Sequence, residues 1–258
     1  LSNLFATRDN WRHQVVDLSQ MLRVARDDSF EPNLQAASGN AELLVNTAQI
    51  DYVGQSLGVI LGSLYTSVSP DVEKAVLNVP GADPVLILTE SPSFAPQLNA
   101  FKAGLAASGV NEGTPAFDTF SNFARWILDP ADPQNTAVYM KNSATRPAGR
   151  DVLLQYITED QTIPNRSTER LIAAANRPLA EGENNQCKVA EWNPAVTATS
   201  TQVDAADPGL RLQDRHGFLL NFAGATTDPT KTFTAAAQGQ AVGFLATGAV
   251  SPIPDFAK

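Results

Sequence analysis

The segment Gly54-Gln55-Ser56-Leu57-Gly58 places a serine between two glycines in the pattern G-x-S-x-G. The preceding residues 48–53 are typical of a short buried strand, and residues 59–68 are typical of an apolar helix. At so tight a strand-to-helix turn the serine backbone is strained and its hydroxyl rises above the sheet. We therefore predict that Ser56 is a nucleophile and that the backbone N–H of Leu57 faces the developing oxyanion. The alternative is a glycine-rich turn with an inert serine.

A serine nucleophile needs a base, and the chain has two histidines, His13 and His216. A nucleophile at such a turn is followed in the chain first by the acid and then by the histidine. Only His216 satisfies that order, whereas His13 precedes the serine and falls on the solvent side of an expected helix. We predict that His216 is the base. The alternative is that His216 is an ordinary surface histidine.

The acid must lie between the serine and the histidine. Residues 158–164 form a loop after Asp151 to Ile157, which is the strongest strand pattern in the second half of the chain. A carboxylate at the carboxyl end of a strand lies on the edge where α/β sheets place their sites. We therefore predict that Asp160 orients the histidine ring, with the neighbouring Glu159 as the competing choice. Later alternatives are Asp204, Asp207 and Asp214.

The elements around this serine imply the fold class. A strand, a turn, a helix and a second strand over residues 74–79 follow one another closely, as in a βαβ unit. This unit requires a parallel sheet. We expect an α/β fold with a mostly parallel sheet flanked by helices, including helices over residues 11–25, 167–176 and 232–247. Residues 27–41 indicate a loop, residues 178–209 a polar surface excursion, and residues 210–212 a last short strand.

Residues 82–148 differ from the rest because they are rich in Pro, Ser, Asn and Gly and contain short helical stripes of phenylalanine and leucine. We predict that this stretch is a helical lid or cap inserted over Ser56. Its apolar stripes suit an acyl or polymer chain. The expected organisation is a hydrolase core over residues 1–81, the lid over 82–148, and a second part of the core over 149–258.

Composition excludes several classes of function. The chain has 258 residues, with 27 Asp and Glu against 18 Lys and Arg, and a net charge of −9. This balance argues against nucleic-acid binding and against a polybasic membrane contact. The single cysteine, Cys187, permits no disulfide within the chain and no cysteine cluster, so we expect no metal and no cofactor. Asp129 and Asp132 fit two Asp–Pro turns better than a metal pair.

Location is indicated only by general features. The longest apolar stretch, residues 53–68, is interrupted by polar side chains and is too short to span a bilayer. The chain begins with Leu1 rather than Met, and we expect either a mature form or a piece of a longer protein. Its acidic balance, low lysine content and many Thr, Asn, Gln and Pro residues suit a secreted or cell-surface protein.

These residues together resemble the catalytic portion of α/β-hydrolase lipases, in particular the large extracellular or outer-membrane lipases of bacteria. The resemblance spans about residues 2 to 220 and is weakest over 82–120 and 178–209. It implies a carboxylic ester hydrolase with Ser56, Asp160 and His216 as its catalytic triad. The stretches that carry it are Ala6 to Asn10, Tyr52 to Gly58, Val76 to Gly81, Leu128 to Pro133 and His216 to Leu219.

The chain departs from that family in two places. Val59 stands where such lipases often have another glycine. The family also places four strands and a His–Gly oxyanion loop before the serine, whereas the residues before Ser56 indicate mostly helix and loop and contain no His–Gly pair. Because proteins avoid long apolar sheet edges, we expect a companion polypeptide or a missing N-terminal segment to complete the sheet and supply the second oxyanion donor.

The expected reaction is therefore hydrolysis of a lipid or polymeric ester through an acyl-enzyme. One alternative is an extracellular depolymerase of polyesters of the polyhydroxyalkanoate type, which would use the same three residues. An alternative of another class is a catalytically inactive, hydrolase-like binding protein.

Overall fold

The core of the protein is a four-stranded sheet in which every strand is parallel to its neighbour. The computed structural model describes residues 3–146, 149–179, 184–193, 215–220 and 229–253. The strand order is β1-β2-β3-β4. The strands are β1 (Ile50–Gln55), β2 (Val72–Asn78), β3 (Asp151–Ile157) and β4 (Lys188–Trp192). The predicted α/β class with a parallel sheet is confirmed.

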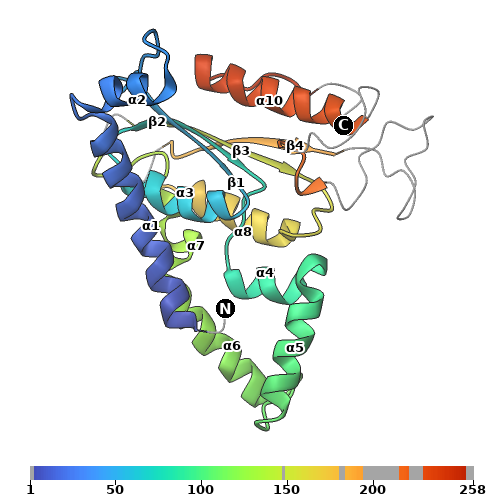
Figure 1. Ribbon diagram of the computed structural model, residues 1–258. Helices are drawn as coiled ribbons and strands as arrows, with labels where there is room; N and C mark the ends of the chain where they lie inside the picture. The colour runs from blue at the N-terminus through green and yellow to red at the C-terminus, as the bar shows by residue number, and fades with distance from the viewer. Residues whose placement is uncertain (1–2, 147–148, 180–183, 194–214, 221–228, 254–258) are drawn as a thin grey trace.

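Helices cover both faces of this sheet (Figure 1). The C-terminal helix α10 lies over one face, and α3 and α8 lie under the other, with α1 packed beside α3. None of the helices in the described ranges combines the length and the apolar character needed to cross a membrane. Their bounds are α1 (Leu4–Ala25), α3 (Leu57–Val68), α8 (Asn165–Ala175) and α10 (Pro229–Thr247).

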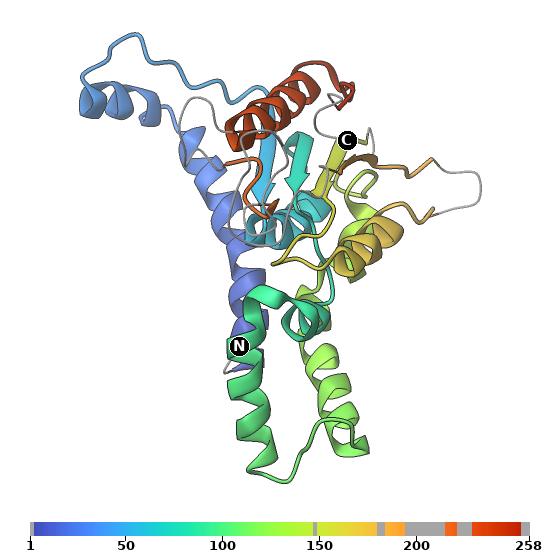
Figure 2. The ribbon, with the colours of Figure 1, turned by 90° about the vertical axis from the view of Figure 1, so that its right-hand side faces the viewer.

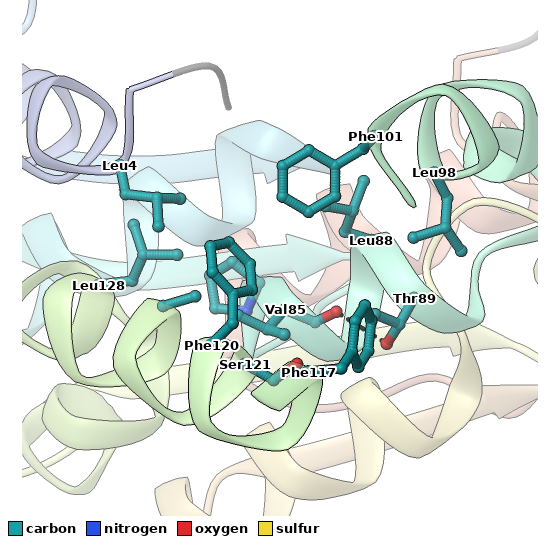
Figure 3. A pocket seen from close by; sticks show the side chains of 12 residues that line it. Leu4, Val85, Leu88, Thr89, Leu98, Phe101, Phe117, Phe120, Ser121 and Leu128 are labelled. Carbon is teal, nitrogen blue, oxygen red and sulfur yellow. Dashed lines mark hydrogen bonds between the residues drawn. The ribbon is translucent and has the colours of Figure 1, made fainter. Parts of the chain in front are cut away.

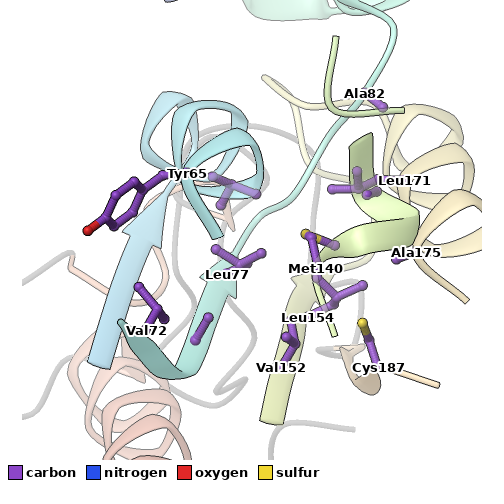
Figure 4. Packing of buried hydrophobic residues seen from close by; sticks show 13 residues of the cluster. Tyr65, Val72, Leu77, Ala82, Met140, Val152, Leu154, Leu171, Ala175 and Cys187 are labelled. Atoms are coloured by element: carbon purple, nitrogen blue, oxygen red, sulfur yellow. The ribbon is translucent and has the colours of Figure 1, made fainter. Parts of the chain in front are cut away.

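Alternation along the central strands builds two apolar clusters. Val76 and Leu153 are fully buried among aromatic side chains beneath α10. Their neighbours Leu77 and Leu154 point to the opposite face, where they pack with Leu171 of α8 (Figure 4). Successive side chains of a strand point to opposite faces, so a sheet covered on both sides needs apolar residues at consecutive positions. Because both faces of the central strands are packed, the carboxyl ends of the strands, where the candidate site lies, are held in fixed positions.

A helical projection extends from the carboxyl end of β2 (Figure 2). It consists of α4 (Pro84–Glu90), η1 (Pro92–Phe94), α5 (Ala95–Ala106) and α6 (Pro115–Leu128). The following η2 (Asp129–Ala131), α7 (Pro133–Thr136) and η3 (Ala137–Tyr139) return to the core. There Ala137 and Met140 are buried in the cluster between the sheet and α8. The stretch 82–148 thus contains a projecting part and a part packed on the core, and its identity as a separate domain stays a prediction.

A buried carboxylate joins the projection to the core. The side chain of Asp83 accepts a hydrogen bond from the Leu86 N–H and so caps the N-terminus of α4. It also accepts from Arg125 of α6 at 3.2 Å and is paired with Arg170 of α8. The backbone N–H of Asp83 donates to Asp132 Oδ1 at 3.1 Å. Three helices therefore meet at one side chain, which fixes the angle at which the projection leaves the sheet.

Two expectations about the peripheral elements are wrong. The stretch 27–41 contains the helix α2 (Phe30–Ser38), which ends at Gly39 in the left-handed conformation typical of a helix C-terminus. None of its side chains is buried, so it has no apolar stripe that sequence periodicity would detect. The stretch 178–209 contains β4, whose residues alternate between buried and exposed along the sheet edge. The expected strand over 210–212 lies outside the described residues.

Candidate active site

Ser56 occupies the sharp corner between β1 and α3. Its φ of 56° is in the left-handed region, which costs a residue with a side chain about 1–3 kcal/mol. A Cβ at position 54 would lie 2.4 Å from the Gly58 carbonyl oxygen, so only glycine fits there. Tyr52 donates its hydroxyl hydrogen to the same oxygen at 2.7 Å. The Ser56 N–H donates to the carbonyl of Asn78 at the end of β2, which ties the corner to the sheet.

The structure brings Ser56, His216 and Asp160 together at the carboxyl edge of the sheet. Ser56 Oγ lies 2.7 Å from His216 Nε2. His216 Nδ1 lies 2.9 Å from Asp160 Oδ2 and 3.1 Å from Asp160 Oδ1. An ionised carboxylate can only accept hydrogen bonds, so Nδ1 carries the proton and Nε2 is left to accept from the serine hydroxyl. The arrangement can remove the serine proton during attack on an electrophilic carbon.

The loop after β3 holds Asp160 in place. Asp160 Oδ1 accepts hydrogen bonds from the backbone N–H groups of Thr162 at 2.7 Å and Ile163 at 3.0 Å. The Asp160 side chain is only 2% exposed. The competing acid, Glu159, points elsewhere and forms an ion pair with Arg215. The contact with His216 is therefore made by Asp160, while Asp204, Asp207 and Asp214 lie outside the described residues.

Two further side chains hold the histidine segment, and the sequence reasoning missed both. Gln55 donates from Nε2 to the backbone carbonyl of His216 at 2.9 Å. Arg215, whose side chain is 1% exposed, donates to the carbonyl of Thr158 at 2.8 Å and pairs with Glu159 at 2.9 Å. Burial lowers the pKa of the Arg215 guanidinium. The sequence feature that could have indicated them is their position, because each of these residues directly precedes a predicted catalytic residue.

The first N–H groups of α3 lie directly behind the serine. Leu57 is the first residue of α3, and the early N–H groups of a helix have no partner within the helix. The same end of the helix carries a positive partial charge, which favours an oxyanion. The Leu57 N–H is therefore in the position expected for an oxyanion donor.

An apolar cavity of about 530 Å³ opens beside Ser56 and Leu57. This volume lies in the range of small-molecule sites. Its walls come from α1, α3, α4, the η1–α5 segment and the loop that carries Asp160. Gln97 and Thr162 add two polar groups to a lining that is otherwise mainly apolar. The apolar part includes Ile60, Ile87, Leu88, Phe94, Phe101 and Ile163.

Other residues that could take part in chemistry lie away from Ser56, Asp160 and His216. His13 is exposed on α1, 3.5 Å from Asp17. Cys187 is buried, and burial raises the pKa of its thiol to about 12, which removes it as a nucleophile at neutral pH. Within the described part of the chain, no group of three or more His, Cys, Asp or Glu residues is arranged to hold a metal ion.

The side chain of Asp132 stabilises local backbone structure. Its Oδ1 accepts from the N–H of Gln134 at 2.9 Å, which caps α7, and from the N–H of Asp83. Burial raises the pKa of the Asp132 carboxyl to about 6. The neighbouring Asp129 accepts from the Asn135 side chain through its carbonyl at 2.9 Å. Both aspartates thus act in turns and helix caps.

The strand–serine–helix corner on a parallel sheet, with the acid and the histidine on later loops, defines the fold type. The chain has an α/β fold with a four-stranded parallel sheet flanked by helices, and its serine corner has the strand–turn–helix form that α/β-hydrolases also have. No protein-family model and no curated protein sequence matches the chain.

Solved structures are similar over part of their length. A thermophilic esterase from Thermogutta terrifontis is 16% identical, with 85% of this chain and 62% of that chain covered and a TM-score of 0.39. Acetyl xylan esterase 1 from a Thermoanaerobacterium species is 14% identical, with 66% and 48% covered and a TM-score of 0.36. A puromycin-hydrolyzing peptidase of Mycobacterium tuberculosis is 15% identical, with 66% and 21% covered and a TM-score of 0.37. The chain spans less than two thirds of each of these proteins.

Proposed function

We propose that this protein is a serine hydrolase that cleaves carboxylic esters through an acyl-enzyme intermediate. The observation that supports the proposal is the chain of contacts from Ser56 Oγ to His216 Nε2, and from His216 Nδ1 to Asp160, at 2.7 and 2.9 Å. These distances lie within the range that proton transfer requires.

In the first half of the reaction, Ser56 Oγ attacks the ester carbonyl carbon and its proton passes to His216 Nε2. Asp160 stabilises the imidazolium that forms, and the Leu57 N–H donates to the oxyanion of the tetrahedral intermediate. When that intermediate collapses, the bond to the alcohol oxygen breaks and His216 returns the proton to the leaving alcohol. The acyl group stays on Ser56.

In the second half, a water molecule takes the place of the alcohol. His216 removes a proton from this water as its oxygen attacks the acyl carbon. The second tetrahedral intermediate collapses, the bond between Ser56 Oγ and the acyl carbon breaks, His216 gives the proton taken from water to Ser56 Oγ, and the carboxylic acid is released. Each proton that leaves a reactant is thereby returned to a leaving group.

We further propose that α4, α5 and α6 act as a lid or cap over the serine. Leu88 of α4 and Phe101 of α5 line the cavity that begins at Ser56, so these helices are placed to contact a bound ester. Their apolar side chains favour a substrate with a hydrocarbon acyl group. A lipid ester is the substrate that we favour. We also propose that the protein is secreted or displayed at the cell surface.

A companion segment beside β1 is also proposed. β1 is one of the two edge strands of the described sheet, and Val53 in its middle is 51% exposed. Parallel strands are normally covered on both faces, and exposed apolar edges invite pairing. A missing N-terminal segment or a second polypeptide that pairs with β1 would cover this residue. It would also lie next to Ser56, where a second oxyanion donor is needed.

Hydrolysis of p-nitrophenyl butyrate by the purified chain tests the proposed reaction. An acyl-enzyme predicts a burst of nitrophenol with an amplitude close to the enzyme concentration, followed by slower turnover. Ser56→Ala should abolish both phases, whereas Ser108→Ala, in the exposed turn after α5, should leave both unchanged. If the folded wild-type chain, purified together with any polypeptide that accompanies it, hydrolyses no ester, the proposal is contradicted and the binding-protein alternative is favoured. Product analysis on triglyceride and on aliphatic polyester film then separates lipid from polymer substrates.

A further inference from the structure

A second, smaller cavity lies inside the helical projection. Its volume is about 40 Å³, and its walls come from α4, α5, α6 and the first turn of α1 (Figure 3). The lining is almost wholly apolar, and the hydroxyl of Thr89 already donates to the Val85 carbonyl at 2.9 Å. The space exceeds what one water molecule needs, but it offers water few polar partners. Such a space favours an apolar occupant.

The two cavities share a wall made of side chains. Pro84, Leu88 and Phe101 line the second cavity and also the cavity that begins at Ser56. The Phe101 ring packs against Phe120 of α6, with ring centroids 5.6 Å apart and the planes tilted by 48°. Figure 3 shows Phe101, Leu88 and Phe120 pointing into the second cavity from three helices. Two of the three shared residues are long side chains, which can change rotamer or be shortened by substitution.

We propose that Phe101 ends the apolar space open to the acyl chain and so sets the acyl length the enzyme accepts, and that the second cavity receives the far end of a longer chain when this ring is removed. This inference rests on the proposed ester hydrolysis at Ser56. The acyl chain is the occupant because the first cavity begins at the nucleophile, and the second, apolar cavity lies directly behind its Phe101 wall. The alcohol, by contrast, must stay beside His216 Nε2 to be protonated as it leaves. With the Phe101 ring in place, the chain has room in the first cavity only.

Shortening Phe101 should therefore join the two cavities. One methylene group in an apolar pocket changes selectivity by roughly tenfold or more. We expect Phe101→Ala to raise kcat/KM for p-nitrophenyl laurate and palmitate relative to butyrate by roughly tenfold. Phe117 lines the second cavity from its far side. Adding Phe117→Trp to Phe101→Ala should refill the space and return the profile toward that of the wild type.

Two controls separate this effect from general damage to the projection. Phe123→Ala removes an exposed ring of α6 that lies outside both linings, and it should leave the chain-length profile unchanged. Labelling of Ser56 by a fluorophosphonate should proceed at similar rates in wild type and Phe101→Ala, because the nucleophile is untouched. A second series, butyrate esters of alcohols of increasing length, should not respond to Phe101→Ala.

The outcomes are distinct. A Phe101→Ala protein whose Ser56 is labelled normally but whose acyl-length profile matches the wild type would overturn the inference and leave the proposed function standing. A shift with alcohol length instead of acyl length would overturn the assignment of the acyl chain. A wild-type chain that neither reacts with the probe nor hydrolyses any of the esters would overturn the proposed function, and this inference with it.

Discussion

Different interactions hold together the residues at the carboxyl edge of the sheet and the residues of the helical projection. At the edge, Ser56, Asp160 and His216 meet through directional hydrogen bonds of 2.7 to 3.1 Å. In the projection, α4, α5 and α6 meet largely through apolar side chains and a tilted pair of aromatic rings. Hydrogen bonds specify one geometry, whereas apolar contacts tolerate changes of similar volume. Substitutions at the edge should therefore lower the rate strongly, and those in the projection should change selectivity in smaller steps.

The buried groups at the junction show how the two regions are coupled. Asp83 is paired with Arg125 in the projection and with Arg170 on the core. Both arginines are partly exposed, while the carboxylate is buried. A buried charge without its partners costs far more than an exposed one. The projection can thus vary its apolar lining while its attachment stays fixed.

The largest effect is expected at the acid. Asp160→Asn keeps the shape of the side chain but can no longer hold the His216 ring in the required tautomer, so kcat should fall roughly 10⁴-fold. Glu159→Gln is the matched control, because Glu159 contacts Arg215 instead, and its kcat should change far less. The measurement is kcat for p-nitrophenyl butyrate at neutral pH. Equal losses in both variants would remove the distinction between these neighbouring acids.

A smaller effect is expected at Arg215, which acts as a positioning residue for His216. Arg215→Met should lower kcat roughly hundredfold, because a misplacement of about 1 Å at the reacting groups has that effect. KM should stay close to the wild-type value, since the cavity is untouched. Arg215→Lys, which keeps the charge, should recover part of kcat. The control is Arg166→Met, which removes an exposed arginine paired with Glu90.

A purely structural role for Arg215 predicts a different pattern. The melting temperature would then fall together with kcat in the Met variant, and the remaining folded protein would turn over at the wild-type rate. Active-site titration of the folded fraction by a fluorophosphonate separates the two. Normal turnover per labelled site would exclude the positioning role.

The smallest effect is expected at the junction and concerns stability. Burial raises the pKa of Asp132 to about 6 from an ordinary value of 3.8. A carboxyl with a raised pKa in the folded state contributes stability that is fully present below 3.8 and is lost as the pH rises through about 6. Asp132→Asn keeps the acceptor oxygen but cannot titrate. Relative to this variant, the wild type should gain about 3 kcal/mol of unfolding free energy across that window as the pH falls.

Urea unfolding of both proteins at a series of pH values checks this expectation. Asp118→Asn, at an exposed position on α6, is the matched control and should keep the wild-type pH dependence. Parallel curves for wild type and Asp132→Asn would show that the buried carboxyl contributes nothing to the pH dependence.

The same contrast explains how far the sequence predicts the structure. The corner at Ser56 was visible because a strained turn demands glycine at position 54 and a strand and a helix on its two sides. Chain order then pointed to Asp160 and His216. By contrast, α2 has no buried side chain to create a periodic pattern, and only one face of β4 is buried.

The contacts of Arg215 and Gln55 could not be predicted from the sequence for another reason. Each bond joins segments that are distant along the chain, with separations of 57 and 161 residues. No local pattern encodes which loops meet at the carboxyl edge of a sheet, since that depends on the packing of the whole core. The size and partition of the two cavities depend on the same packing.

Intact-mass spectrometry before and after treatment with a fluorophosphonate probe tests the central claim most directly. The account predicts one adduct per chain, mapped to Ser56, and none in Ser56→Ala or after His216→Ala within the same incubation. The untreated spectrum also reveals any companion polypeptide that accompanies the chain. A folded chain that gains no adduct, or gains one at a residue other than Ser56, would contradict the assignment of Ser56 as the nucleophile.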